Sequence, residues 1–348
     1  MNTFPLFNKK LLKEDDNTLF LSYLNYMDNF VLKIQSESED KKEVPLTFYP
    51  IAKNIRTTSS YMAINILNGN ASYLDNMARN GEPNFWYYEK KMGNWFPWLW
   101  SRGRINGDDY KNIDGWKYYF NSFTKNQNIK TNNIIHCIKP PDDLALFFAY
   151  LSCIKYVFQF NDNYKTIMDN HKKSMNWPAS DEKVLAVQIR RGETCSVDGS
   201  ISPDRPFYHV YKYIESIEEL LQSNDFEYIY ISTDSDLEID YIQKHRPEWK
   251  LLYLHIDRKQ FFRLNENLVD LEVSCTMLPE RIPFIVDSGL ADLYFISQSQ
   301  GYISTISMSE FSRCGWYLQM AFQGKLTPYI NMNDDILDMN VRDKLLLL

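Results

Sequence analysis

The segment from Lys183 to Glu193, KVLAVQIRRGE, constrains the fold more than any other part of the chain. Its apolar run, residues 184–189, is typical of a strand that is covered on both faces in a parallel α/β sheet. Arg190 and Arg191 therefore follow the carboxyl end of a buried strand, where open α/β sheets bind their ligands. A guanidinium there suits the paired oxygens of a diphosphate, and the plain alternative is a surface arginine pair bridged to Glu193.

Helical and extended patterns alternate through the second half of the chain. The expected helices cover residues 208–221, 236–245, 283–295 and 309–322, and the expected strands after the first cover 228–232, 250–254 and 300–304. Ser309 is a plausible N-cap of the last helix. This alternation predicts a parallel sheet with right-handed crossovers.

The first half is expected to be helical in several places. Leu19, Tyr23, Tyr26 and Phe30 recur at helical spacing, and the polar run at 35–43 is expected to be a loop. Further along, the pattern predicts a strand at 134–138 and helices at 142–158 and 163–175, with a domain boundary near residue 178.

Length and composition narrow the class of protein. The 348 residues exceed the usual single-core domain, so two domains are expected. The net charge of -7 argues against a nucleic-acid partner. Scattered Cys and His residues give no metal-site spacing, and the P-loop and dinucleotide-binding motifs are absent, so no metal and no cofactor is expected. Without a signal-peptide core or a long apolar run, we expect an intracellular, cytoplasmic protein with no transmembrane segment.

Three polar segments directly follow predicted strands. They are residues 190–193, 232–236 and 304–309. Parallel strands bring their carboxyl ends to one edge of the sheet, so the arginines and hydroxyl groups of these segments can surround a diphosphate there. A helix amino terminus at the same edge adds partial positive charge.

The order and spacing of these segments resemble the GT-B fucosyltransferases, especially the α1,6-fucosyltransferases of N-glycan cores and their rhizobial Nod-factor relatives. Weaker likeness extends to the α1,2- and protein O-fucosyltransferases. The matching motifs are Gln188-Ile189-Arg190-Arg191-Gly192-Glu193, Ser232-Thr233-Asp234-Ser235-Asp236, and Phe295-Ile296-Ser297 followed by Thr305-Ile306-Ser307 and Arg313. The likeness spans about residues 134–325.

This resemblance implies a two-domain GT-B-like α/β fold. An acceptor-side α/β domain would cover residues 1–178 and a Rossmann-like donor domain 179–325, with 326–348 as a helix that crosses back to the first domain. The implied activity is inverting, metal-independent transfer of L-fucose from GDP-fucose to a glycan hydroxyl. The partners would be the nucleotide-sugar donor and an oligosaccharide acceptor.

The resemblance also implies roles for particular residues. Arg190 would hold the β-phosphate and Arg191 would assist at the sugar end. The base would be Asp198 or the closer carboxylate Glu193, because the attacking hydroxyl must lose a proton. The remaining donor-binding residues would be Gln188, Asp234, Asp236, Thr305 and Ser307.

Two departures from the pattern leave alternatives open. Gln188 stands where the family usually has His, and Ser235 separates the two acidic residues of the second motif, so the donor could be another nucleotide sugar. Asp234-Ser235-Asp236 also fits the DxD pattern of metal-dependent GT-A glycosyltransferases. A non-catalytic sugar-nucleotide-binding module is the alternative of a different class.

Overall fold

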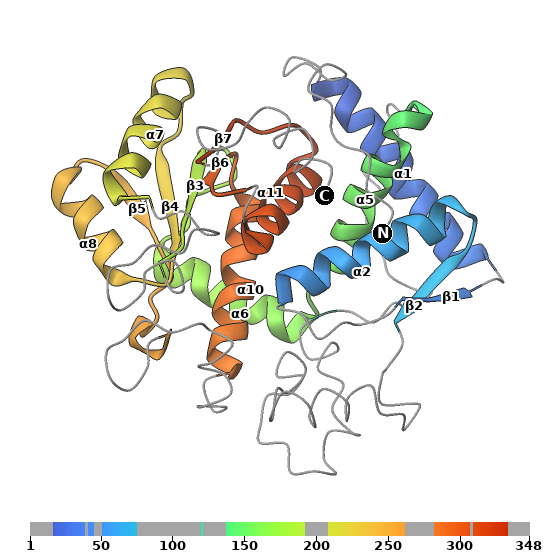
Figure 1. The fold of residues 1–348 in the computed structure, drawn as a ribbon, viewed down its shortest axis with the longest axis horizontal. Helices are drawn as coiled ribbons and strands as arrows, with labels where there is room; N and C mark the ends of the chain where they lie inside the picture. Colours follow the sequence, from blue (N-terminus) through green and yellow to red (C-terminus); the bar gives the residue numbers. More distant parts are fainter. Residues whose placement is uncertain are drawn as a thin grey trace, which may run out of the picture.

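The computed structural model describes residues 17–38, 41–44, 51–74, 120, 137–191, 208–261, 282–306 and 309–332, and Figure 1 shows their arrangement. The elements of the first half are α1 (Asn17–Glu37), β1 (Lys41–Val44), α2 (Ile51–Leu67), β2 (Ala71–Leu74), α5 (Asp142–Val157) and α6 (Asp162–Met175). Those of the second half are β3 (Val184–Ile189), α7 (Val210–Ser223), β4 (Tyr228–Thr233), α8 (Asp236–His245), β5 (Lys250–Leu252), η3 (Arg258–Phe261), α10 (Ile282–Gln298), β6 (Gly301–Ser304), α11 (Glu310–Gln323) and β7 (Tyr329–Asn331).

Five parallel strands form the main sheet in the order β5-β4-β3-β6-β7. The central strand β3 is buried along its whole length, and its Val187 pairs with Ile231 of β4 on one side and Ile303 of β6 on the other. The chain proceeds outward from β3 to β4 and β5, then returns to β6 beside β3 and continues to β7 at the other edge of the sheet. The sheet is therefore Rossmann-like, as predicted, and the strand order reverses between β3 and β6.

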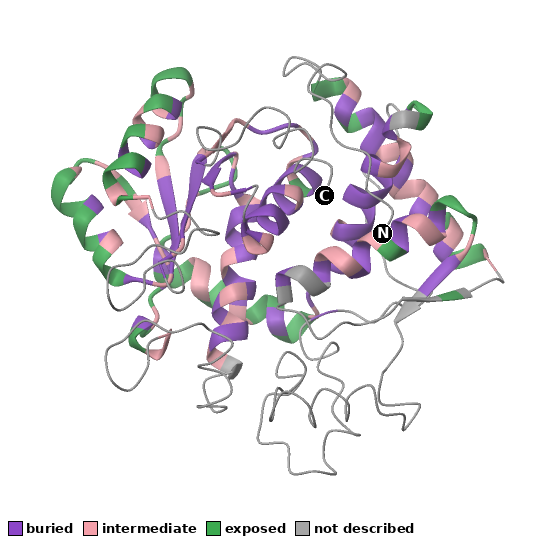
Figure 2. Ribbon diagram, in the orientation of Figure 1, coloured by how far each residue is buried: buried purple, intermediate pink, exposed green. Residues whose placement is uncertain are grey.

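Helices cover both faces of this sheet. α7 and α8 pack on the face that carries Leu185, Val187 and Ile189 of β3. α10 and α11 pack on the opposite face, which carries Ala186 of β3 and Tyr230 of β4. Figure 2 shows exposed residues on the outer sides of α7 and α8 and mostly buried residues along β3, β4, β6, α10 and α11. Coverage on both faces explains why β3 has an almost continuous apolar sequence.

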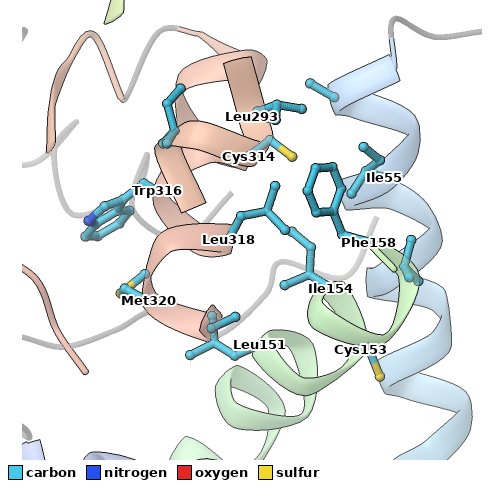
Figure 3. Packing of buried hydrophobic residues seen from close by; sticks show 14 of the residues in the cluster. Ile55, Leu151, Cys153, Ile154, Phe158, Leu293, Cys314, Trp316, Leu318 and Met320 are labelled. Carbon is cyan, nitrogen blue, oxygen red and sulfur yellow. The ribbon is translucent and has the colours of Figure 1, made fainter. Parts of the chain in front are cut away.

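The helices of the first half share a core with α11. α2 and α5 pack against each other and both contact α11, and a two-stranded parallel sheet, β1-β2, lies beside them. Figure 3 shows Ile55 of α2 and Leu151 and Ile154 of α5 gathered against Cys314 and Leu318 of α11. All five side chains are fully buried. The apolar core is thus continuous from α1, α2 and α5 to one face of the main sheet.

Local sequence signals fix the elements next to the β3–β6 edge. Ser309 caps α11 as predicted, because its hydroxyl accepts the Ser312 N–H at 3.2 Å. The helix ends at Gln323, and its C-cap Gly324 has a φ of 65°, in the left-handed region. Gly301 begins β6 where an added Cβ would lie only 2.4 Å from the Phe226 ring, so only glycine fits without movement.

The expected elements of the second half are confirmed, with ends that differ by a few residues. Several expectations for the rest were wrong. Within the predicted strand at 134–138, Cys137 and Ile138 are not in a strand, and Ile138 instead donates its N–H to the Ser22 carbonyl of α1; residues 134–136 lie outside the described residues. The polar run at 35–43 holds the end of α1 and the start of β1, because pairing with β2 outweighs its polar composition.

Two further differences concern α2 and the segment after residue 325. The helix α2 was not predicted, although it forms one wall of the shared core. The segment expected as a closing helix, 326–348, contributes strand β7 to the sheet through Tyr329–Asn331, which pairs with β6. Residues 333–348 lie outside the described residues. The sheet therefore continues past residue 325.

Candidate functional site

The candidate site is the carboxyl edge of the sheet where the strand order reverses, between β3 and β6. Ligands of open α/β sheets bind in the crevice outside such a switch point. Arg190 follows β3 directly, Asp234 follows the neighbouring strand β4, and Thr305 follows β6. The polar segments that the sequence places after three strands thus belong to three adjacent strands.

A direct hydrogen bond links the ends of β3 and β4. The Arg191 N–H donates to Asp234 Oδ1 at 2.9 Å. Beside it, the Ser235 N–H donates to the Thr233 hydroxyl at 3.3 Å. Asp234 therefore fixes the path of the chain that leaves β3, which is the segment that carries the arginine pair.

The Arg191 side chain lies on the α7–α8 face of the sheet. It is 4% exposed, and its guanidinium forms an ion pair with Glu238 of α8 and donates to the Tyr208 carbonyl at 2.8 Å. It also lies 5.8 Å from the centre of the Tyr213 ring. These contacts make Arg191 an anchor between β3 and the two helices. Its role at the sugar end stays a prediction.

Arg190 is half-buried at the end of β3. Successive residues of a strand point to opposite faces, so Arg190 falls on the same side as Gln188 and opposite to Arg191. That side is the one covered by α10 and α11. On this alternation the two neighbouring arginines belong to opposite faces of the sheet.

Arg258 joins the ends of β4 and β5 to α8. This residue of η3 is 3% exposed and donates to the Thr233 carbonyl, the Leu254 carbonyl and Asp236 Oδ1, each at 3.0 Å. The Asp236 carboxylate, which the sequence assigned to donor binding, is thus held by a guanidinium at the amino terminus of α8. Arg258 was not predicted from the sequence.

Asp292 of α10 adds a carboxylate to the same edge. The Tyr230 hydroxyl of β4 donates to it, and Ser232 also contacts it. Burial raises the pKa of Asp292 to about 6, and the hydrogen bond from Tyr230 and the charge of Arg258 partly oppose this increase. A carboxyl that titrates near neutral pH at a sheet edge is typical of functional sites.

Gln188 links β3 to β6 and α11. Its Oε1 accepts the hydroxyls of Ser304 and Ser312, each at 2.7 Å. The three side chains are 6%, 0% and 0% exposed, respectively. Past the end of β6, the Thr305 carbonyl accepts the Ser309 N–H at 3.1 Å, and Thr305 itself is half-buried.

A charged cluster lies at the first turn of α11. Arg56 of α2 pairs with Glu310, whose other oxygen is 3.8 Å from Arg313. Burial and the neighbouring charge of Arg56 lower the pKa of Arg313. Arg313, the arginine of the third motif, is therefore paired within its own helix, and the first half of the chain contacts the turn that follows Ser309.

Three predicted site residues, Glu193, Asp198 and Ser307, lie outside the described residues. Within the described part of the chain, no group of three His, Cys, Asp or Glu side chains is arranged to hold a metal ion. Among the same residues, no helix has both the length and the apolar character to cross a bilayer.

Sequence reasoning missed Glu238, Arg258, Asp292 and Arg56. Glu238 carries a weak signal, because it lies in the first turn of a helix that follows a motif strand. Arg258 and Asp292 reach the site through tertiary packing, because η3 and α10 contact β4 although neither is next to it in the sequence. Arg56 belongs to the first half, where no motif was available.

Among known proteins, the chain is similar to solved structures only. No family model and no curated protein matches the chain. It is similar to a NodZ α-1,6-fucosyltransferase soaked with GDP-fucose, at 11% identity and a TM-score of 0.41, over 81% of this chain and 93% of that one. It is similar to the fucosyltransferase NodZ from Bradyrhizobium, at 10% identity and a TM-score of 0.39, over 80% and 93%. A mutant of FUT1 from Arabidopsis thaliana in complex with GDP aligns at 12% identity and a TM-score of 0.40, over 86% and 77%. Likenesses at this level carry no assignment of function.

Proposed function

We propose that this chain is a glycosyltransferase that takes a nucleotide sugar, GDP-fucose in the first instance, and transfers the sugar to a glycan hydroxyl. The observation that carries the proposal is the position of the three motif segments. They follow β3, β4 and β6, which are adjacent parallel strands around the switch point. The five-stranded parallel sheet is the kind that holds a nucleotide diphosphate at this edge.

The proposed mechanism is a single displacement without a metal. Arg190 and the amino terminus of α11, capped by Ser309, would offset the negative charge of the departing diphosphate. Glu193 or Asp198 would remove the proton of the acceptor hydroxyl as its oxygen attacks C1 from the opposite face. The sugar would then be transferred with inversion. Gln188, Asp234, Asp236 and Arg191 would support the donor site, and Thr305 with Ser307 would contribute hydroxyl groups.

A metal-dependent glycosyltransferase of the DxD type is the second candidate. It would use the carboxylates of Asp234 and Asp236 on a divalent ion. In the structure, Asp234 accepts the Arg191 N–H and Asp236 pairs with Arg258. These contacts favour a role of both carboxylates in shaping the edge, and they support the metal-independent proposal.

The test begins with binding. A panel of sugar nucleotides is measured by thermal shift, with and without EDTA, and hydrolysis or transfer is followed by release of the nucleoside diphosphate. We expect GDP-fucose or GDP to stabilise the chain equally in both conditions. Stabilisation that requires a divalent ion would favour the second candidate. Binding without any release of diphosphate, even with glycan acceptors, would favour a binding module.

Arg190→Ala tests the central residue. We expect it to lose most of the turnover, on the order of 10²-fold or more, while the thermal unfolding midpoint stays close to that of the wild type. Turnover retained in this variant would reject the role of Arg190. A matched control is Arg246→Ala, which removes a half-buried arginine that pairs with Glu218 away from this edge.

A further inference from the structure

Three side chains, Gln188, Ser304 and Ser312, form a buried polar cluster directly below the switch point; we call them the Gln188 cluster. One atom, Gln188 Oε1, accepts both serine hydroxyls at 2.7 Å. The residues come from β3, β6 and α11, and both serines lie more than a hundred positions after Gln188 in the sequence. The cluster therefore ties together the three elements that border the candidate site.

Its position relates it to the residues above it. Gln188 lies two residues before Arg190, on the same face of β3. Ser304 is the last residue of β6, directly before Thr305. Ser312 lies one turn after Ser309, and its N–H donates to the Ser309 cap. A change in the Gln188 cluster would thus alter the spacing between Arg190 and the amino terminus of α11.

The packing makes this contact difficult to replace. Ser304 and Ser312 are fully buried, and the buried Tyr302 hydroxyl lies close to both of them. At Gly315, an added Cβ would lie 3.1 Å from the same Tyr302 hydroxyl, so α11 already approaches β6 closely. Buried hydroxyls that lose their acceptor must find another, and the nearby elements would have to move to provide it.

We infer that Gln188 is a positioning residue: its carbonyl oxygen holds β6 and the first turn of α11 against β3, and so sets the distance between Arg190 and the α11 amino terminus on either side of the bound diphosphate. This inference rests on the proposed function and deepens it. It also gives a physical reason for glutamine, and not histidine, at this position. A neutral amide oxygen accepts two hydroxyls at any pH, whereas a histidine accepts one, and only in its neutral form.

The experiment compares Gln188→Met, which has a similar shape but no amide acceptor, with Ser299→Ala. Ser299 is a fully buried serine whose hydroxyl bonds only locally, to the Phe295 carbonyl at 2.9 Å, so it is the matched control. The probes are GDP affinity by calorimetry and the KM and kcat of GDP-fucose turnover. We expect Gln188→Met to weaken GDP binding about tenfold and to lower kcat on the order of 10²-fold. The effect on kcat is larger because displacement of Arg190 removes more stabilisation from the transition state than from bound GDP. Ser299→Ala should keep both values.

A double-mutant cycle separates positioning from a general loss of stability. Ser312→Ala alone should weaken GDP binding in the same direction by a smaller factor. In the Gln188→Met background it should add nothing, because its acceptor is already gone. If Gln188→Met does not fold, Gln188→His provides the test. Its kcat relative to the wild type should fall as the pH is lowered through the titration of the new imidazole.

Several results would overturn the inference. The first is a Gln188→Met variant with the GDP affinity and kcat of the wild type. The second is a Ser312→Ala change that weakens GDP binding equally in the wild-type and Gln188→Met backgrounds. The third is a ratio of Gln188→His kcat to wild-type kcat that does not change with pH. A wild-type protein that binds no GDP and releases none from GDP-fucose would instead reject the proposed function itself. The two failures are therefore distinguishable.

Discussion

Replacing Asp292 by asparagine should make the protein more stable above neutral pH. Burial raises the pKa of this carboxyl from 3.8 to about 6 in the folded protein. A group whose pKa is higher in the folded state favours folding while it is protonated, and that contribution is lost as the pH increases through the folded pKa. At pH 8 the charged carboxylate therefore opposes folding by about 3 kcal/mol, from a difference of roughly two pH units at 1.36 kcal/mol each.

Asparagine is a suitable replacement because it keeps the hydrogen bond. The Tyr230 hydroxyl donates to Asp292 Oδ1, and the amide oxygen of asparagine can accept it in the same place. Burial also raises the pKa of Tyr230, so its phenol stays protonated and remains a donor. The substitution thus removes the charge while it leaves the contact in place.

The assay is urea denaturation of the wild type and Asp292→Asn between about pH 5 and pH 8. We expect the free energy of unfolding of the variant to exceed that of the wild type by up to about 3 kcal/mol at pH 8 and by about half of that at pH 5. The gain at the lower pH serves as the internal control. The reasoning would be refuted if the difference in free energy of unfolding between the variant and the wild type were constant from pH 5 to pH 8. It would also be refuted if the variant were less stable than the wild type at pH 8.

Three further changes test the packing around the site. Arg191→Met should lower the free energy of unfolding by about 3–5 kcal/mol, because it leaves the largely buried Glu238 carboxylate without its guanidinium; urea denaturation measures it, and adding Glu238→Leu should restore part of the loss. Ser309→Ala should cost about 1 kcal/mol, read from the thermal unfolding midpoint, and a cost near zero would argue against the cap. Gly301→Ala should destabilise by about 1–3 kcal/mol through contact with Phe226, and Phe226→Leu in the same chain should relieve it.

The sequence predicted the second half of the fold well because its signals are local. The apolar run of β3, the Ser309 cap and the regular alternation of strands and helices each depend on neighbouring residues, and each is found in the structure. The first half gave weaker predictions. β1 has a polar sequence that is extended because it pairs with β2, and its strand character is a consequence of tertiary contact.

The site was predictable only in outline for the same reason. Motif spacing indicated which loops meet at the edge of the sheet. It did not indicate that Arg258 would hold Asp236 or that Tyr230 would hold Asp292, because these pairs join elements distant in sequence. A side chain's direction at the end of a strand also depends on which helices cover each face.

The motif residues at the ends of β3 and β4 hold one another and the neighbouring elements in place. At the end of β3, the Arg191 side chain enters the α7–α8 layer, and strand alternation places Arg190 on the side covered by α10 and α11. After β4, Asp236 is held by Arg258, and Asp234 fixes the backbone of Arg191. The contacts of Arg191 and Asp234 thus fix the backbone that carries Arg190. A guanidinium at position 190 would be poorly placed without the buried contacts of Arg191 and Gln188, and for this reason substitutions at these two supporting positions should reduce turnover even though neither side chain needs to touch the donor.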